Sequence, residues 1–225
     1  MRTALLALPL AALLGCETGT APAAVPAASP DVPVFEGDFT LVDDAADRPD
    51  FVAFREDLRA VVARRDTAAL LGLVAEGARL SFGDDPGGPE GFRQMWFTGR
   101  PPAGGPVWDV LGTALAGGSV DEDGAVTVPF VPALWPSDLD PFAHVAVVER
   151  DVPAYDQPGG EPIARLSEIT VPVLAPPLDG WRQVRLPDGR AAFVAADRAL
   201  SPVGYRAVFW DDGDGWRLRS FLAGD

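Results

Sequence analysis

The stretch from residue 144 to residue 195 reads HVAVVERDVPAYDQPGGEPIARLSEITVPVLAPPLDGWRQVRLPDGRAAFVA. Short apolar runs alternate here with Gly, Pro and Asp turn residues, and no helical period appears. The pattern predicts five strands, at residues 144–150, 163–166, 169–174, 181–186 and 190–195. Five strands in about fifty residues are typical of a small barrel or sandwich.

The order of turns and strands in this stretch is also informative. It contains V-x-x-R-D-x-P at residues 147–153, Tyr155 and Pro158 in a first long loop, A-x-L at residues 164–166, ITVPV at residues 169–173, D-G-W-x-x-V at residues 179–184, and P-D-G-R-x-x-F-V at residues 187–194. This order resembles that of bacterial Src-homology-3 domains, and the match covers less than a third of the chain.

The resemblance implies an all-β SH3-like small barrel over residues 141–203, with Tyr155, Trp181 and Phe193 as ligand-binding residues. It places Tyr155 in a loop that forms one wall of a peptide groove. Trp181 follows an Asp-Gly turn at a strand start, so it is also expected to be largely buried between the sheets. The sequence departs from the family in two places, because Ser167-Glu168 replaces a glycine and Ala192-Phe193 replaces a Gly-Trp pair. The groove need not be intact.

Prolines punctuate residues 129–142, so we place a domain boundary there, with Trp135 packing between the two parts. Residues 47–140 are expected to form an α+β domain of small helices and a hairpin. Asp47 should cap a first helix, and Asp66 a second that stops near Gly77. The remaining expected elements are a strand at residues 79–82, helices at residues 89–97 and 107–116, and a hairpin turning at residues 121–124.

Residues 204–225 are expected to form a strong hairpin, because two alternating runs flank the turn DDGDG of residues 211–215. The hairpin resembles the closing hairpin of SnoaL-like α+β folds, which also begin with helices. It therefore either completes the N-terminal domain around an inserted barrel or follows the barrel in a tandem arrangement.

The first residues of the chain predict the location of the protein in the cell. A basic start and a short apolar run end in LLGC at residues 13–16, which resembles the lipobox of bacterial lipoproteins. Residues 1–15 are then a signal peptide, and Cys16 is the lipidation site that anchors the protein in a bilayer. Residues 16–46 are read as a Pro/Ala-rich tether, in which the more apolar residues 34–42 offer a strand that lies against the body. Glu17, in place of an inner-membrane retention aspartate, favours the outer membrane, with the protein facing the periplasm.

Composition excludes several classes of function. The formal net charge is −15, and the chain has no lysine, so nucleic acid is not an expected partner. The only histidine, His144, sits against the apolar run of residues 145–148, so we expect no histidine metal site and no Cys-His or Ser-His pair in one subunit. We expect no catalytic residues, no metal and no cofactor. The acidic turns lack the glutamate spacing of a calcium loop.

These observations favour a non-enzymatic, membrane-anchored envelope lipoprotein that binds cell-wall peptide (peptidoglycan) or an envelope protein through its SH3-like domain. One alternative is a small-molecule or carboxylate-dependent catalytic pocket near Asp84, Asp85 and Trp96. The other is a periplasmic inhibitor or assembly factor. Converging carboxylates in a deep apolar pocket would favour the first alternative, and an exposed aromatic groove would favour a binding protein.

Overall fold

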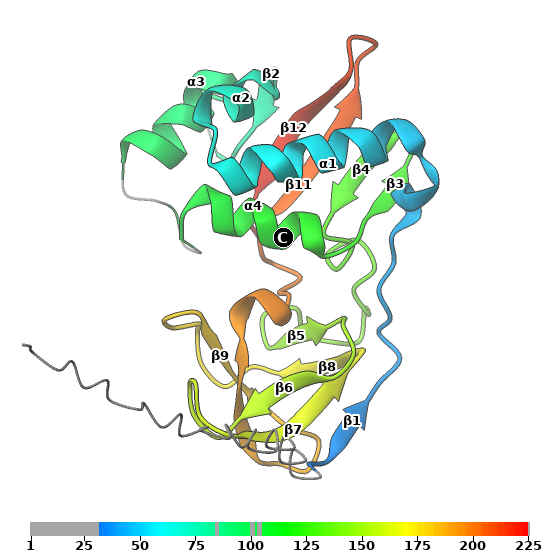
Figure 1. The fold of residues 1–225 in the computed structure, drawn as a ribbon, viewed down its shortest axis with the longest axis vertical. Coiled ribbons are helices and arrows are strands. Elements are labelled where there is room, and N and C mark those ends of the chain that lie inside the picture. The colour runs from blue at the N-terminus through cyan, green and yellow to red at the C-terminus, as the bar shows by residue number, and fades with distance from the viewer. Residues whose placement is uncertain (1–31, 84–85, 100–101, 103–104, 225) are drawn as a thin grey trace, which may run out of the picture. The chain divides into compact units, whose positions relative to one another are not determined.

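A computed structural model describes residues 32–83, 86–99, 102 and 105–224 (Figure 1). Cys16, the signal peptide and residues 16–31 of the expected tether lie outside this part of the chain, as do Asp84 and Asp85. The described residues belong to one compact unit, Val32–Asp225. It is an α+β structure with two five-stranded sheets and one two-stranded sheet.

The helices belong to the first part of this unit. They are α1 (Pro49–Arg64), α2 (Thr67–Gly72), α3 (Gly88–Arg93) and α4 (Val107–Ala116), preceded by the 3-10 turn η1 (Asp44–Asp47), with the π-helical segment η2 (Gln94–Thr98) following α3. Pro49 occupies the first turn of α1 as expected, since its missing N–H has no helical partner there. Asp66 caps α2 as expected, accepting a hydrogen bond of 3.0 Å from Ala69 N. The expected helix at residues 107–116 is confirmed.

Three of the expected boundaries are wrong. Arg48, not Asp47, precedes α1, because Asp47 is the last residue of η1. The second helix ends at Gly72 instead of near Gly77. The following residues form strand β2 (Val74–Arg79), which replaces the strand expected at residues 79–82. Pairing with a distant strand of the chain stabilises β2, and this partner is not visible in the local sequence.

The C-terminal hairpin lies in the middle of the sheet that carries these helices. Its strands β11 (Arg206–Asp211) and β12 (Trp216–Leu222) join β2, β3 (Val120–Glu122) and β4 (Ala125–Val128) in the order β2-β12-β11-β4-β3. β11 pairs antiparallel with β4, and β12 pairs parallel with β2. The hairpin therefore completes the sheet of the first part of the chain, which the sequence left open.

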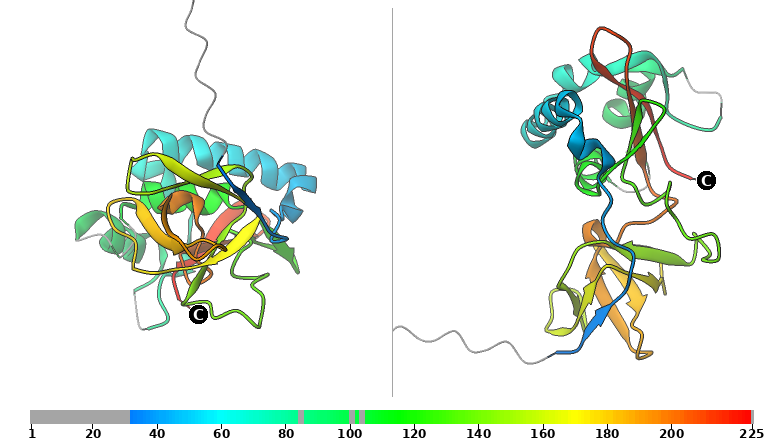
Figure 2. Two further views of the ribbon diagram at one scale, coloured as in Figure 1. Left: turned by 90° about the horizontal axis from the view of Figure 1, so that it is seen from below. Right: turned by 90° about the vertical axis from the view of Figure 1, so that its right-hand side faces the viewer.

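Helices α1 and α4 cover one face of this sheet (Figures 1 and 2), and aromatic rings fill the space between them. Phe51 of α1 is fully buried, and its ring centroid lies 4.8 Å from that of Trp216 and 5.9 Å from that of Phe209 on the hairpin. Burial of such rings is a large favourable contribution to folding. The hairpin and α1, far apart in sequence, thus share one core.

The expected all-β part consists of open sheets. Strands β6 (Val152–Tyr155), β7 (Pro162–Ser167), β9 (Trp181–Arg185) and β10 (Ala191–Ala195) form a sheet with β1 (Val34–Glu36), in the order β1-β7-β6-β10-β9. β5 (His144–Val147) pairs separately with β8 (Ile169–Pro172). Within the residues that the structure describes, these strands do not close into a barrel, which corrects our expectation. β1 lies in the more apolar stretch at the end of the expected tether and joins the sheet at residues 34–36, so the strand expected there is confirmed for these three residues.

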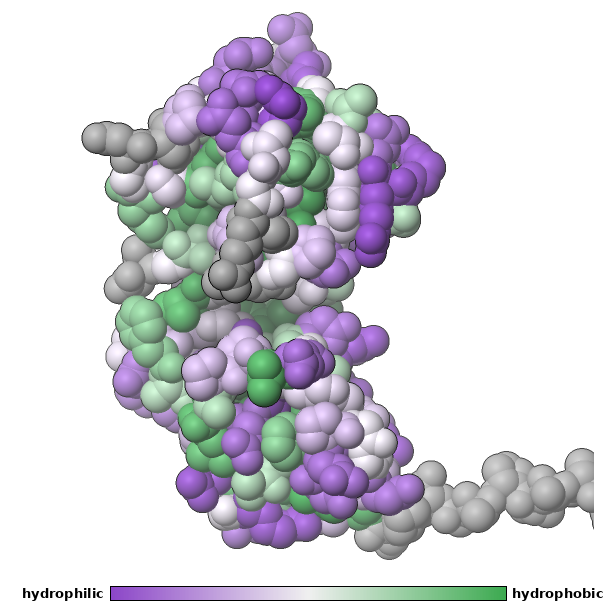
Figure 3. Space-filling view, turned by 90° about the vertical axis from the view of Figure 1, so that its left-hand side faces the viewer, coloured by the Kyte–Doolittle hydropathy of each residue, from purple (hydrophilic) through white to green (hydrophobic). Residues whose placement is uncertain are grey.

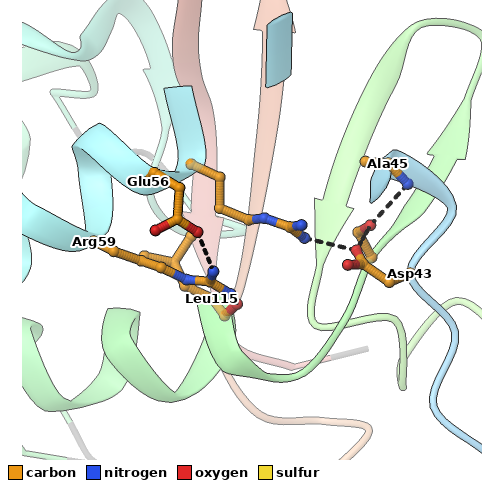
Figure 4. A network of polar contacts seen from close by, with 7 residues as sticks. Asp43, Ala45, Glu56, Arg59 and Leu115 are labelled. Carbon is orange, nitrogen blue, oxygen red and sulfur yellow. Dashed lines mark hydrogen bonds and ion pairs between the residues drawn. The ribbon is translucent and has the colours of Figure 1, made fainter. Parts of the chain in front are cut away.

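A polar network fastens the segment after β1 to α1 (Figure 4). Arg55, only 6% exposed, donates to Asp43 Oδ1 over 2.6 Å. Ser119 Oγ donates to the same oxygen over 2.5 Å and accepts a hydrogen bond from Ala45 N over 3.1 Å. The neighbouring Arg59 donates to Leu115 O of α4 and to Glu56 of its own helix. The contacts of Asp43, Ser119 and Leu115 join segments that are distant in sequence, and the contact between Arg59 and Glu56 orients a side chain within α1.

The first residues of the proline-rich boundary are buried, whereas Leu134 and Phe142 further along it are exposed. Phe130 and Val131 are buried in a cluster with Ala146 of β5 and Leu200, and Trp135 packs against this cluster. Ala146 and Leu200 also exchange two backbone hydrogen bonds of 2.8 Å. These residues form a buried cluster of their own, which contains residues of both parts and is separate from the core of each part.

Candidate functional site

Tyr155 lies in strand β6 and not in a long loop as the resemblance implied. Its Cα is paired with that of Phe193 on β10. Along both strands buried residues alternate with half-buried ones, so Tyr155 and Phe193 share the face opposite the buried side chains of Ala154, Ala192 and Val194. We call this the outer face of the sheet.

Trp181 joins the two other aromatic residues on the outer face. It is paired with Ala195 at the start of β9, and its ring meets that of Tyr155 edge-on, with the centroids 5.3 Å apart and an interplanar angle of 86°. Ala195 belongs to β10, the strand between β6 and β9, and its small side chain leaves room for the two rings to meet. The three residues singled out from the sequence are thus brought together.

Trp181 is nevertheless half-buried, and the expectation that it would be largely buried between the sheets is wrong. On β9, Arg182 and Val184 point to the interior side of the sheet, so Trp181 points to the outer face. Position in a strand, rather than hydrophobicity, decides which face a side chain occupies. The ring is consequently available as a contact surface.

Two arginines that the sequence analysis missed flank these rings. Arg165, paired with Pro153, and Arg185, paired with Ala191, lie on the same outer face by the alternation of β7 and β9. Their guanidinium groups donate to the backbone carbonyls of Asp151 and Gly189. Neither forms an ion pair with a carboxylate of the described chain. The alternation of side chains along β7 and β9 would have identified both arginines, but only after the bounds of these strands were known.

The outer face therefore combines aromatic surface with positive charge in an otherwise acidic protein. Three rings offer flat apolar area, and the Tyr155 hydroxyl and the side chain of Gln183, paired with Phe193, offer hydrogen bonds. Arg165 and Arg185 can each bind a carboxylate in a fork geometry. This combination suits an extended peptide that carries carboxylates, and it contains no nucleophile–base pair.

Trp96, which was expected to line a pocket with Asp84 and Asp85, is a core residue. Trp96 is 4% exposed and packs in the core, with ring centroids 5.1 Å from Tyr205 and 5.4 Å from Phe221. The neighbouring Asp84 and Asp85 lie outside the described residues. Trp96 belongs to the interior because η2 turns it onto the hairpin strand β12.

His144 and Asp211, which the sequence analysis also considered, make local contacts with the backbone. His144 Nδ1 lies 3.1 Å from the carbonyl oxygen of Asp140. Asp211 Oδ1 accepts hydrogen bonds from Gly213 N and Gly215 N, as in a tight turn. Among the described residues, no group of His, Cys, Asp and Glu is arranged to hold a metal ion.

Comparison of the chain with models of known protein families, with curated proteins and with solved structures found no match. In the part of the chain that the structure describes, no helix has the length and apolar character needed to cross a bilayer.

Proposed function

We propose that the protein is a non-enzymatic lipoprotein of the bacterial envelope, anchored through lipid on Cys16, whose outer face binds carboxylate-bearing peptides of the cell wall. The observation that carries the binding proposal is the grouping of Tyr155, Trp181 and Phe193 with two arginines that have no carboxylate partner among the described residues. The LLGC sequence supports the anchor, and the order of turn motifs supports an SH3-like origin of the β part.

Electrostatics is compatible with binding at this face. A chain with a formal net charge of −15 repels an acidic wall at long range. Contact is then restricted to places where positive charge is locally unpaired, and Arg165 and Arg185 supply such a place. An aromatic platform adds affinity without sequence selectivity, which suits a repetitive polymer.

Retention on purified peptidoglycan tests the proposal. Tyr155→Ala and Trp181→Ala should each weaken retention about tenfold, which corresponds to about 1.4 kcal/mol. Their melting temperatures should stay close to that of wild type, because both rings are half-buried on the surface of the sheet. Trp210→Ala is the matched control, since Trp210 is an exposed tryptophan on β11, outside the outer face.

The salt concentration separates the electrostatic contribution to binding from the contribution of the aromatic rings. Arg165→Gln should weaken retention at low ionic strength and have less effect at high ionic strength, where charge interactions are screened. Absence of retention of the wild type at every salt concentration, or loss of stability together with binding in Tyr155→Ala, would contradict the proposal. Retention on an envelope protein instead of the wall would favour the assembly-factor alternative.

A further inference from the structure

A cavity of about 820 Å³ lies on the other side of β9, away from the outer face. Its walls come from α4, from the turn before β9, from the 3-10 turn η3 (Ala196–Arg198) and from the segment that leads into β11. Figure 3 shows the molecular surface hollowed between its upper and lower parts, with hydrophobic residues deep in the hollow. This volume is in the range of sites that take small molecules.

The interior of the cavity contains one cation without an observed partner. Arg182 alternates with Trp181 and Gln183 along β9, so its side chain leaves the sheet on the cavity side. Its Nε atom is buried and has no hydrogen-bond partner, and its guanidinium forms no ion pair within the described residues. Burial lowers the pKa of Arg182. The Arg182 side chain as a whole is half-buried, and a partly desolvated cation without an anion is unfavourable for folding, so an anionic ligand would complete this site.

The rest of the lining gives the ligand its other properties. Val110, Pro129, Leu200 and Val203 supply apolar wall, and the Tyr205 ring, whose hydroxyl pKa is raised by burial, lies among them. These groups suit a ligand with an uncharged side chain next to its anionic group.

The remaining charges of the cavity are three carboxylates, on Asp109, Asp179 and Asp197. Asp179 and Asp197 are exposed, and the side chain of Asp109 is also mostly exposed, 3.7 Å from Arg65. Exposed carboxylates repel a multiply charged anion and attract an ammonium group. A phosphate dianion is therefore disfavoured, and a ligand with one carboxylate and one ammonium group is favoured.

We propose that this cavity binds a free amino acid or short peptide, with its α-carboxylate on Arg182, its ammonium group toward the acidic rim and its side chain against the apolar wall. The planar guanidinium matches a carboxylate in two parallel hydrogen bonds. The site is independent of the outer face, because it lies on the opposite side of β9.

Calorimetric titration of the purified protein in mild detergent tests this proposal with the dipeptide Ala-Leu and its C-terminal amide. Ala-Leu should bind saturably, and the amide at least tenfold more weakly, because it lacks the carboxylate. Arg182→Gln should weaken Ala-Leu binding at least tenfold. Arg219→Gln is the matched control, because Arg219 is an exposed arginine of β12 that belongs neither to the cavity lining nor to the outer face, and it should leave Ala-Leu binding unchanged.

A purely structural role for Arg182 makes a different prediction. Arg182→Met removes the unpaired charge but keeps much of the apolar stem, so the proposal expects an unchanged or raised melting temperature together with lost binding. A lowered melting temperature with Ala-Leu binding retained would overturn the proposal. Equal binding of Ala-Leu and its amide, or no saturable binding of either one to the wild type, would also overturn it.

Discussion

At the scale of single residues, Arg55 shows how one buried charge organises the start of the compact unit. Burial of Asp43 by itself would raise the pKa of its carboxyl group. Hydrogen bonds from Arg55 and Ser119 and the positive charges of Arg55 and Arg59 outweigh burial, so the pKa of Asp43 lies below its ordinary value of 3.8. The ionised form of Asp43 is therefore the form that the fold stabilises.

Replacing Asp43 by asparagine should lower the free energy of unfolding by about 2 kcal/mol at neutral pH, because hydrogen bonds to charged groups contribute about 1.5–3 kcal/mol. A lowered folded-state pKa stabilises the fold above the unfolded-state pKa, and this stabilisation is lost as the pH falls through the folded-state pKa. The difference between wild type and Asp43→Asn should thus be complete at about pH 6 and shrink below about pH 4.

Urea unfolding at several pH values measures this difference. Asp44→Asn is the control, since the side chain of Asp44 is exposed and takes no part in the network, while its backbone N–H donates to Ser119 O in either variant. Parallel pH profiles for wild type and Asp43→Asn would show that the Asp43 carboxylate does not stabilise the fold through Arg55.

At the scale of elements, the hairpin β11–β12 near the C-terminus packs against helix α1 near the start of the compact unit. Trp216 of β12 is 6% exposed, donates from Nε1 to Asp50 over 3.2 Å and packs edge-on against Phe51. The guanidinium carbon of Arg48 lies 4.7 Å from its ring centroid. One residue of the hairpin thus holds the first turn of α1 through apolar, hydrogen-bond and cation–π contacts.

Trp216→Ala should lower the free energy of unfolding by about 3–5 kcal/mol, as expected for removal of a buried aromatic ring. Trp210→Ala should change it by less than about 0.5 kcal/mol, because Trp210 is 41% exposed on the adjacent strand. Chemical denaturation followed by circular dichroism compares the two variants. Equal effects would mean that the hairpin is not fastened to α1 through Trp216.

At the scale of the whole molecule, the helical part and the β part are joined by a shared cluster around Phe130, Val131 and Leu200. The segment of prolines between them does not act as a free linker, because Trp135 donates from Nε1 to Leu139 O and its ring packs 5.7 Å from that of Phe39. The outer face and the Arg182 cavity are therefore built on one unit that a lipid anchor would carry to the membrane.

The anchor proposal predicts that the protein produced in a bacterial host partitions into the detergent phase of Triton X-114 and incorporates labelled palmitate. Two or three fatty chains on one cysteine are needed for stable attachment, and a single chain binds only marginally. Cys16→Ser should lose both properties while keeping the wild-type circular dichroism spectrum. An unlabelled wild-type protein in the aqueous phase would refute the anchor.

Several elements were predictable from short stretches of sequence. The apolar face of α4, the Pro49 start of α1, the cap by Asp66 and the turn at residues 211–215 depend on residues within about ten positions of one another, as do helix period and turn chemistry in general. The three aromatic residues singled out from the sequence lie on one face of the sheet, although Tyr155 was assigned to a loop and Trp181 to the core. The all-β character of residues 144–195 was likewise visible in their turn spacing.

Other features depend on contacts between residues that are far apart in the chain. β1 and β2 exist as strands because they pair with β7 and β12, and Trp96 is buried because Tyr205 and Phe221 cover it. The side of the sheet on which Trp181 and Arg182 lie follows from the register of β9 with β10, since a shift of one residue would exchange their faces. The Arg182 cavity has walls from α4, β9 and the segment before β11, and no local pattern records that these three segments meet. Local propensity acts over a few residues, whereas register, burial and cavities are set by the packing of the complete chain.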